Sequence, residues 1–212
     1  DVTRTWPVSG QFTEIQLNLY NIVQRAHAAA IGECRPGARF RDVHLAAARS
    51  LTQGLIDLAL MEGDANDLVE RGTHAVFFPH GVGHLIGLDV HDLELFGDRA
   101  GYGSGRQRSD TFGLNHLRLD RDLEPGMVVT IEPGFYVIPS LLSDSGMRDR
   151  FGAGIRWETI QRRAPFGGIR IEDDVLITEG GNQVLTEAVV RNASDVTEKV
   201  GSGPTPEARF SA

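Results

Sequence analysis

The chain has 212 residues, and its 21 basic and 29 acidic side chains give a formal net charge of −8 at pH 7. That length suffices for one domain with a sizeable core or for two small ones, while the acidic balance argues against nucleic acid as a partner, because binding phosphates needs a positive surface. No apolar run approaches the length of a membrane span and no signal peptide is visible, so we expect neither a transmembrane segment nor a membrane partner.

Two helices are predicted in the first third of the chain. Residues 2–6, mostly β-branched or aromatic, favour a strand before them. A capping-box pattern beginning at Thr13 starts the first helix, whose apolar side chains recur at helical spacing as far as about Cys34. The second helix has one apolar face, beginning at Val43, and is expected to end near Gly63.

Cys34 is the only cysteine, so no intrachain disulfide can form. We expect it to be a small buried hydrophobe at the end of the first helix. The absence of disulfides suits a reducing compartment, and we expect a cytoplasmic protein.

The segment from Phe77 to Asp92 holds three of the chain's seven histidines, His80, His84 and His91. Imidazole is a common metal ligand and a proton carrier near neutral pH, and the glycines beside these histidines allow a backbone or a substrate to approach closely. The same glycines argue against a helix, so the spacing of His80 and His84 does not indicate a helical zinc motif. A single histidine would more often be a structural group, but three in this setting predict a functional site.

The remaining elements are a short helix before the histidines and, after them, one long polar loop, one helix, three strands and a tail. The loop is expected to be functional or mobile, because glycine-rich loops of this length are uncommon inside compact domains. In chain order these elements are a helix around 66–71, the loop 93–115, a strand at 128–131, a helix at about 156–163, strands at 168–178 and 183–190, and a disordered tail from about residue 201.

Two glutamates lie in or beside predicted strands, Glu132 after 128–131 and Glu172 within 168–178. A carboxylate buried without a partner costs several kcal/mol, so each must be exposed, paired or bound to a cation. Exposure on the wet face of a strand is one reading. The other is a site of carboxylates and one imidazole, which suits manganese, cobalt, iron or zinc better than calcium. Two such ions about 3.5–4 Å apart could share carboxylates and activate a water.

Four segments together resemble a known family. They are the histidine segment 79–92, the stretch 123–134 around Glu132, the stretch 168–174 around Glu172, and residues 1–6. Taken in chain order, with residues 1–6 first, they are similar to signatures of the pita-bread metallopeptidases, most closely the proline-specific branch, aminopeptidase P and prolidase. The resemblance covers about residues 1–190. It implies an α+β fold, a curved antiparallel sheet backed by helices, incomplete at its N-terminal side, with residues 1–200 as the catalytic domain and 201–212 as a tail.

The resemblance also implies a dinuclear metal site. Its ligands in this chain would be Asp1, His84, Glu132 and Glu172, and the family's first aspartate is expected upstream of Asp1. Two divalent ions are implied, with manganese expected first and cobalt, zinc or iron as alternatives.

Further residues take roles in catalysis and substrate binding through the resemblance. Glu132 would also accept the proton of the attacking water, and His80 and His91 would line the substrate site and stabilise the reacting amide. Arg118 and Arg170 match arginines near the site, and the position of Arg118 suits a dipeptide's free carboxylate. Their alternative role is surface solubility.

The implied reaction is hydrolysis of the peptide bond before proline by a metal-bound hydroxide. Substrates would be short peptides with proline at the second position, and the sequence leaves open whether these are dipeptides or longer peptides. A homodimer is expected for the full-length enzyme. The alternatives are a catalytically inactive pita-bread binding protein, a fragment inactive because one aspartate is missing, and a metal-free amidinohydrolase, against which the intact Glu132 and Glu172 argue.

Overall fold

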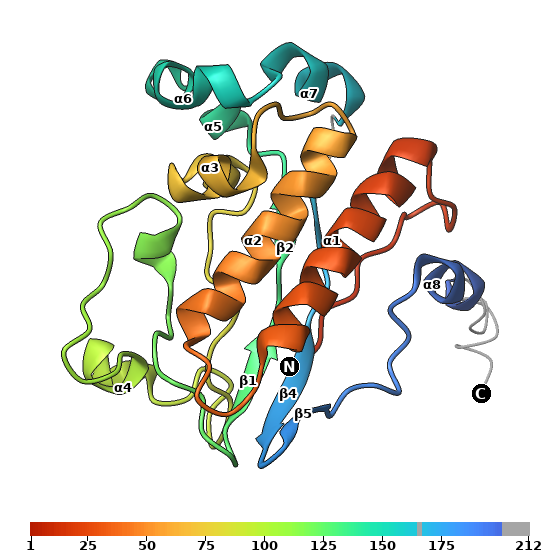
Figure 1. Ribbon diagram of the computed structural model, residues 1–212. Coiled ribbons are helices and arrows are strands. Elements are labelled where there is room, and N and C mark those ends of the chain that lie inside the picture. The colour runs from red at the N-terminus through yellow and green to blue at the C-terminus, as the bar shows by residue number, and fades with distance from the viewer. Residues whose placement is uncertain (165–166, 201–212) are drawn as a thin grey trace.

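The computed structural model describes residues 1–164 and 167–200. Long helices come first and the strands come late in the chain, as Figure 1 shows. In chain order the elements, with 3₁₀ helices marked η, are α1 (Glu14–Glu33), α2 (Phe40–Asp57), α3 (Ala65–Glu70), η1 (Thr73–Val76), η2 (Glu94–Phe96), α4 (Asp98–Gly101), η3 (Leu114–His116), β1 (Val128–Ile131), β2 (Gly134–Tyr136), α5 (Pro139–Ser143), α6 (Ser145–Phe151), η4 (Gly152–Gly154), α7 (Trp157–Arg163), β3 (Gly168–Arg170), β4 (Asp173–Thr178), β5 (Gly181–Val184) and α8 (Ala193–Lys199).

Helices α1 and α2 lie side by side across one face of the strands (Figure 1). The predicted capping box of α1 is confirmed, because the Thr13 hydroxyl accepts the Gln16 N–H while the Gln16 side chain accepts the Thr13 N–H at 2.9 Å. Among the helices of residues 1–164 and 167–200, none combines the length and apolar character needed to cross a bilayer.

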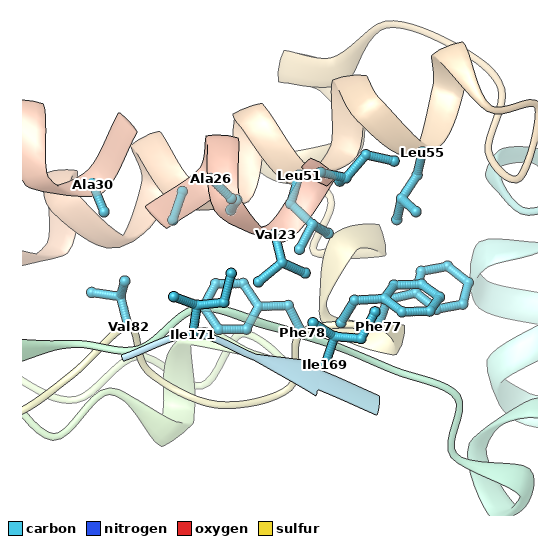
Figure 2. Close-up of a cluster of buried hydrophobic side chains, with 14 of the residues drawn as sticks. Val23, Ala26, Ala30, Leu51, Leu55, Phe77, Phe78, Val82, Ile169 and Ile171 are labelled. Carbon is cyan, nitrogen blue, oxygen red and sulfur yellow. The ribbon is translucent and has the colours of Figure 1, made fainter. Parts of the chain in front are cut away.

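The core lies between this helix pair and the strands. In Figure 2, Val23 of α1 and Leu51 of α2 point from the helices toward Phe78, Ile169 and Ile171, and all five side chains are buried. Burying a side chain of this size contributes roughly 1.5–3 kcal/mol relative to leaving it exposed. The helix pair therefore packs against one face of the strands and stabilises them.

The strands form two antiparallel sheets that meet end to end. One has the order β1-β4-β5, and the other consists of β2 and β3. Ile131 at the end of β1 pairs with Asp173, and Gly134 at the start of β2 pairs with Arg170. The short break between β1 and β2 thus lies opposite the break between β3 and β4. Glu132 and Glu172 sit in these breaks, so the register brings the two carboxylates to the same place.

The histidine segment runs beside β1 and is not helical there, as its glycines predict. The Thr130 N–H donates to the His84 carbonyl at 2.9 Å, and the Glu132 N–H donates to the Val82 carbonyl at 2.7 Å. Gly83 lies between these bonds, and a Cβ atom there would stand 1.8 Å from the Thr130 carbonyl oxygen. This backbone pairing sets His84 beside the end of β1, where Glu132 begins the break.

The prediction of a strand over residues 2–6 is wrong. This segment makes one isolated bridge, between Thr3 and Glu172. Glu172 lies in the break between β3 and β4, so Thr3 pairs with one residue there and the segment does not extend into a β-ladder. The same break divides the strand predicted at 168–178 into β3 and β4.

The ends of two other elements also differ from the prediction. Helix α2 ends at Asp57 and not near Gly63, because the N–H groups of both Leu60 and Met61 turn back to the Leu55 carbonyl. The last strand ends at Val184, beyond which the chain turns.

Several predicted elements are confirmed, and others were missed. Helices α1, α3 and α7 and strand β1 lie where they were expected, whereas α4, α5, α6, α8 and β2 were not predicted. Helix α4, with η2 and the start of η3, lies inside the segment 93–115 that was expected to be a loop. The buried position of Cys34 is confirmed, and burial raises the pKa of its thiol to about 12. The tail predicted from residue 201 lies outside the described residues.

Two buried histidines make the fold sensitive to acid. His44 and His74 are fully buried with ring centroids 5.9 Å apart, and neither has a hydrogen-bond partner for its ring nitrogens among the described residues. Burial lowers the pKa of His74 to about 4; burial, with the nearby charges of His74, His80 and Arg41, lowers the pKa of His44. Both imidazoles are therefore neutral in the folded protein at pH 7.

We expect the free energy of unfolding to fall as the pH drops from about 6.5 toward 4. The unfolded chain binds protons at its ordinary histidine pKa of about 6.5, before the folded protein can, so the contribution is complete above that pH and is lost below it. Each group contributes at most about 1.4 kcal/mol per pH unit. Urea unfolding at several pH values measures how steeply the free energy of unfolding changes with pH. His74→Phe should reduce this pH dependence, whereas His116→Phe, at an exposed position, should not.

Candidate functional site

A cavity of about 400 Å³ lies beside the junction of the two sheets. It is open to one side and draws its walls from the histidine segment, the loop before β1, the strand breaks and the start of the chain. Its lining residues are Asp1, His80, Gly81, His84, His91, His116, Arg118, Glu132, Tyr136 and Arg170.

Three side chains form a group able to hold a metal ion. One ligand atom from each of Asp1, His84 and Glu172 lies within 4.8 Å of the other two. Glu172 is fully buried, and its Oε1 has no hydrogen-bond partner among the described residues. A buried carboxylate oxygen without a partner is costly, and a cation would satisfy it. Two carboxylates and an imidazole are donors for a borderline divalent ion, so the residues present fit a metal.

The orientation of His84 supports this fit. Its Nδ1 lies 2.9 Å from the Leu85 carbonyl, which can only accept, so Nδ1 carries a hydrogen and Nε2 is the nitrogen that offers a lone pair in the neutral ring. Nε2 points into the group, 3.5 Å from Glu132 Oε1 and 3.9 Å from Asp1 Oδ2. Backbone hydrogen bonding of the second nitrogen is a usual way to fix the tautomer of a metal-binding histidine.

Glu132 is held at the edge of this group by an arginine. Its Oε2 accepts from Arg170 at 2.5 Å, and its Oε1 accepts from the Thr130 hydroxyl at 3.3 Å. Glu132 is 9% exposed and lines the cavity, whereas Glu172 lies behind it. Oε1 is thus the more weakly bonded oxygen and the one nearer to His84.

Thr3 links the two glutamates through Arg170. Its hydroxyl donates to Glu172 Oε2 at 2.6 Å and accepts from the Arg170 guanidinium at 2.7 Å. The guanidinium thus touches Glu132 and Thr3 at once, and Thr3 fixes one oxygen of Glu172 while leaving Oε1 to point elsewhere.

We expect Thr3→Val to lower the affinity for a divalent ion by about 10-fold, because outer hydrogen bonds hold metal ligands in place. Calorimetric titration of Mn²⁺ into the metal-free protein measures this affinity. Thr5→Val is the matched control, since the Thr5 hydroxyl bonds the backbone of Arg170 and no carboxylate of the site. Equal losses in both variants would contradict a role of Thr3 at Glu172.

A buried acid beside Glu172 anchors the segment that carries Asp1 and Thr3. Asp173 is fully buried and accepts from Arg4 at 2.7 Å and from Thr186 at 2.6 Å, with His27 at 3.2 Å. Burial by itself raises the pKa of this carboxyl, but the close contact of His27 and the hydrogen bonds from Arg4 and Thr186 outweigh it and lower the pKa to about 2. Arg4 also donates to the Glu172 carbonyl at 2.6 Å, so the first residues of the chain are tied to the strand break.

His80 lines the cavity as a neutral imidazole. Its Nδ1 lies 2.7 Å from the Gly81 carbonyl and must donate, so Nε2 accepts from the Tyr136 hydroxyl at 2.9 Å. Burial lowers the pKa of His80, and the Gly81 hydrogen bond opposes that shift only in part. Both ring nitrogens are engaged, so a direct bond from His80 to a substrate would require Tyr136 to turn away.

His91 and Arg118 occupy the exposed side of the cavity. The His91 ring meets the His84 ring edge to face, with centroids 4.4 Å apart, and its side chain is about half exposed. Arg118 pairs with Glu94 at 2.7 Å. The side chains of His91 and Arg118 are both partly exposed, so each is free to contact a molecule bound in the cavity.

The structure brings every residue of the predicted site to one place. Seven of the eight line the cavity, and Glu172 joins them through the group with Asp1 and His84. Sequence reasoning missed Tyr136, His116 and Thr3. Thr3 was visible only as part of the motif at residues 1–6, and nothing in the spacing of Tyr136 or His116 marks them as site residues.

Comparison with known proteins gives one family and a consistent set of relatives. Residues 1–179 match the model of metallopeptidase family M24. The Xaa-Pro dipeptidase of Homo sapiens is 39% identical over 186 residues, which are 88% of this chain and 36% of that protein. The Xaa-Pro dipeptidase of Shewanella amazonensis is 40% identical over 187 residues, 88% of this chain and 41% of that protein. The chain thus spans about two fifths of the length of these relatives.

Solved structures of aminopeptidase P share the fold. The zinc-substituted Escherichia coli enzyme in complex with product superposes with a TM-score of 0.68 at 34% identity, covering 97% of this chain and 39% of that one. The Pseudomonas aeruginosa aminopeptidase gives a TM-score of 0.66 at 33% identity, covering 93% of this chain and 37% of that one. The expected pita-bread fold, with helices backing antiparallel strands, is confirmed.

Proposed function

The chain belongs to metallopeptidase family M24, and from this we propose that its protein hydrolyses the peptide bond before proline in short peptides, with two divalent metal ions. The observation that carries the proposal is the convergence of Asp1, His84 and Glu172, with a buried Glu172 oxygen that lacks a partner among the described residues. The similarity to Xaa-Pro dipeptidases and to aminopeptidase P supplies the reaction class.

We assign the metal ligands as Asp1, His84, Glu132 and Glu172. Ions held there would polarise the scissile carbonyl and acidify a water. Their identity follows from the donor set only as far as manganese, cobalt, iron or zinc, and manganese stays our first expectation. Cytoplasmic location and a homodimer of the whole protein stay predictions.

Glu132 is assigned as the proton acceptor. Arg170 occupies its Oε2 at 2.5 Å, which leaves Oε1 to take the proton of the attacking water and to pass it to the leaving proline nitrogen. The Arg170 guanidinium holds the carboxylate in this orientation through that contact. Arg170 is thereby a positioning residue for Glu132.

The exposed side of the cavity is assigned to the substrate. His91 stabilises the developing oxyanion with a ring N–H, while His80 and Tyr136, which bond each other, form part of the cavity lining. Proline's amide has no N–H, so the site needs no acceptor for that group. Arg118 offers a guanidinium to a free carboxylate of the substrate.

Hydrolysis by the full-length protein tests the proposal. Alanyl-proline and alanyl-prolyl-alanine are incubated with the protein and Mn²⁺ or Co²⁺, with alanyl-alanine as the control substrate. We expect cleavage of the proline peptides only, lost on chelation and restored by metal. An absence of both cleavage and bound metal would leave a peptide-binding protein without catalysis and would refute the proposal.

A further inference from the structure

The ion pair between Arg118 and Glu94 stands at the boundary of two cavities. Arg118 lines both the 400 Å³ cavity of the site and a neighbouring cavity of about 110 Å³, whereas Glu94 lines only the smaller one. The Arg118 guanidinium donates to Glu94 Oε1 at 2.7 Å, and Glu94 Oε2 lies 3.9 Å from His91 Nδ1. The carboxylate of Glu94 thus sits between two residues that face the substrate.

Glu94 belongs to a short segment at the protein surface. It begins η2, a three-residue helix with no buried side chain. Leu93 enters this helix with a φ of 61°, a value unusual for a residue with a side chain, and the exposed side chains of Leu95 and Phe96 make no core contact. The side chains of Glu94 and Arg118 are 35% and 46% exposed, so solvent can replace either partner of the pair.

We propose that Glu94 is a specificity-determining residue that competes with the substrate's free carboxylate for Arg118. This inference rests on the proposed function, in which Arg118 receives that carboxylate. A dipeptide ending in proline must displace Glu94 or bind with two carboxylates beside one guanidinium. A peptide whose proline is followed by another residue, or by an amide, brings no charge to this point. Glu94 therefore shifts the preference from Xaa-Pro dipeptides toward longer peptides.

The chemistry of the pair sets the size of the effect. An exposed ion pair is weak because water and salt screen it. Its loss is therefore expected to change dipeptide affinity about 5-fold and not by orders of magnitude. The effect requires Arg118, since without its positive charge there is nothing to compete for.

The test compares alanyl-proline with alanyl-prolinamide, which differ at the terminal carboxylate. Binding to the metal-free full-length protein is measured by calorimetry, so that no turnover occurs, and kcat/KM is measured with Mn²⁺. We expect Glu94→Gln to tighten alanyl-proline binding about 5-fold and to change prolinamide binding less than about 2-fold. Asp98→Asn is the matched control. It removes an acid from the same segment, but Asp98 pairs with Arg108, at 2.6 Å, and not with Arg118.

The outcomes separate this inference from the proposed function. Loss of the Glu94→Gln effect in an Arg118→Gln background would support the competition. Equal changes for the two peptides, an equal effect of Asp98→Asn, or weaker dipeptide binding in Glu94→Gln would overturn it even if hydrolysis is normal. Selective binding without any hydrolysis would instead overturn the proposed function and leave the competition standing.

Discussion

Glu132→Gln is expected to lower kcat for an Xaa-Pro substrate by about 10³-fold. Glutamine has nearly the same size and keeps an acceptor for Arg170, which lies 2.5 Å from Glu132 Oε2. It cannot take a proton from water, and it weakens one ligand of the proposed metal site. Steady-state kinetics of the metal-loaded full-length protein gives kcat, and circular dichroism shows whether the fold is kept.

Glu124→Gln is the matched control for this variant. Glu124 precedes the same strand, is exposed, and lies outside the cavity. We expect its kcat to stay within about 2-fold of the wild-type value, as for most exposed substitutions. A Glu132→Gln enzyme that retained more than about a tenth of the activity would contradict the role of Glu132 as the proton acceptor.

The second large effect is expected for Gly83→Ala, which should lower the free energy of unfolding by about 3 kcal/mol or more. A Cβ at this position would stand 1.8 Å from the Thr130 carbonyl oxygen and 2.7 Å from its carbon. Those are backbone atoms of β1, so relief requires the histidine segment to move off the strand. The hydrogen bond from the Thr130 N–H to the His84 carbonyl would then break, and His84 would leave the metal-binding group.

Urea unfolding measures the stability change, and metal analysis of the purified protein measures the loss at the site. Gly32→Ala serves as the control, because a Cβ there meets nothing within 4 Å and the position lies in helix α1. That variant is expected to gain up to about 1 kcal/mol from helix propensity. A free energy of unfolding of Gly83→Ala within about 1 kcal/mol of the wild-type value would contradict this prediction. The close approach of Gly83 to Thr130 would then not be what holds His84 in place.

Local patterns were sufficient for the elements that depend on local interactions. Helix α1 follows from its capping box and apolar spacing, and β1 follows from a short β-branched run between turns. Helix α6 was missed because its seven residues, with one buried side chain, carry too little apolar periodicity. The ends of α2 and β5 were misplaced because they are set by backbone hydrogen bonds to Leu55 and Asp174, which no local pattern displays.

Residue type and motif mark the histidine segment and the two glutamates as candidates for the proposed chemistry without any knowledge of the fold. How these residues meet depends on tertiary contacts. Antiparallel register sets the breaks holding Glu132 and Glu172 opposite each other, and the pairing of the histidine segment with β1 brings His84 to them. The contact of Arg118 with Glu94, 24 residues apart in the chain, is likewise tertiary. Such contacts depend on register and chain path, which are selected by burial of the whole core and not by neighbouring residues.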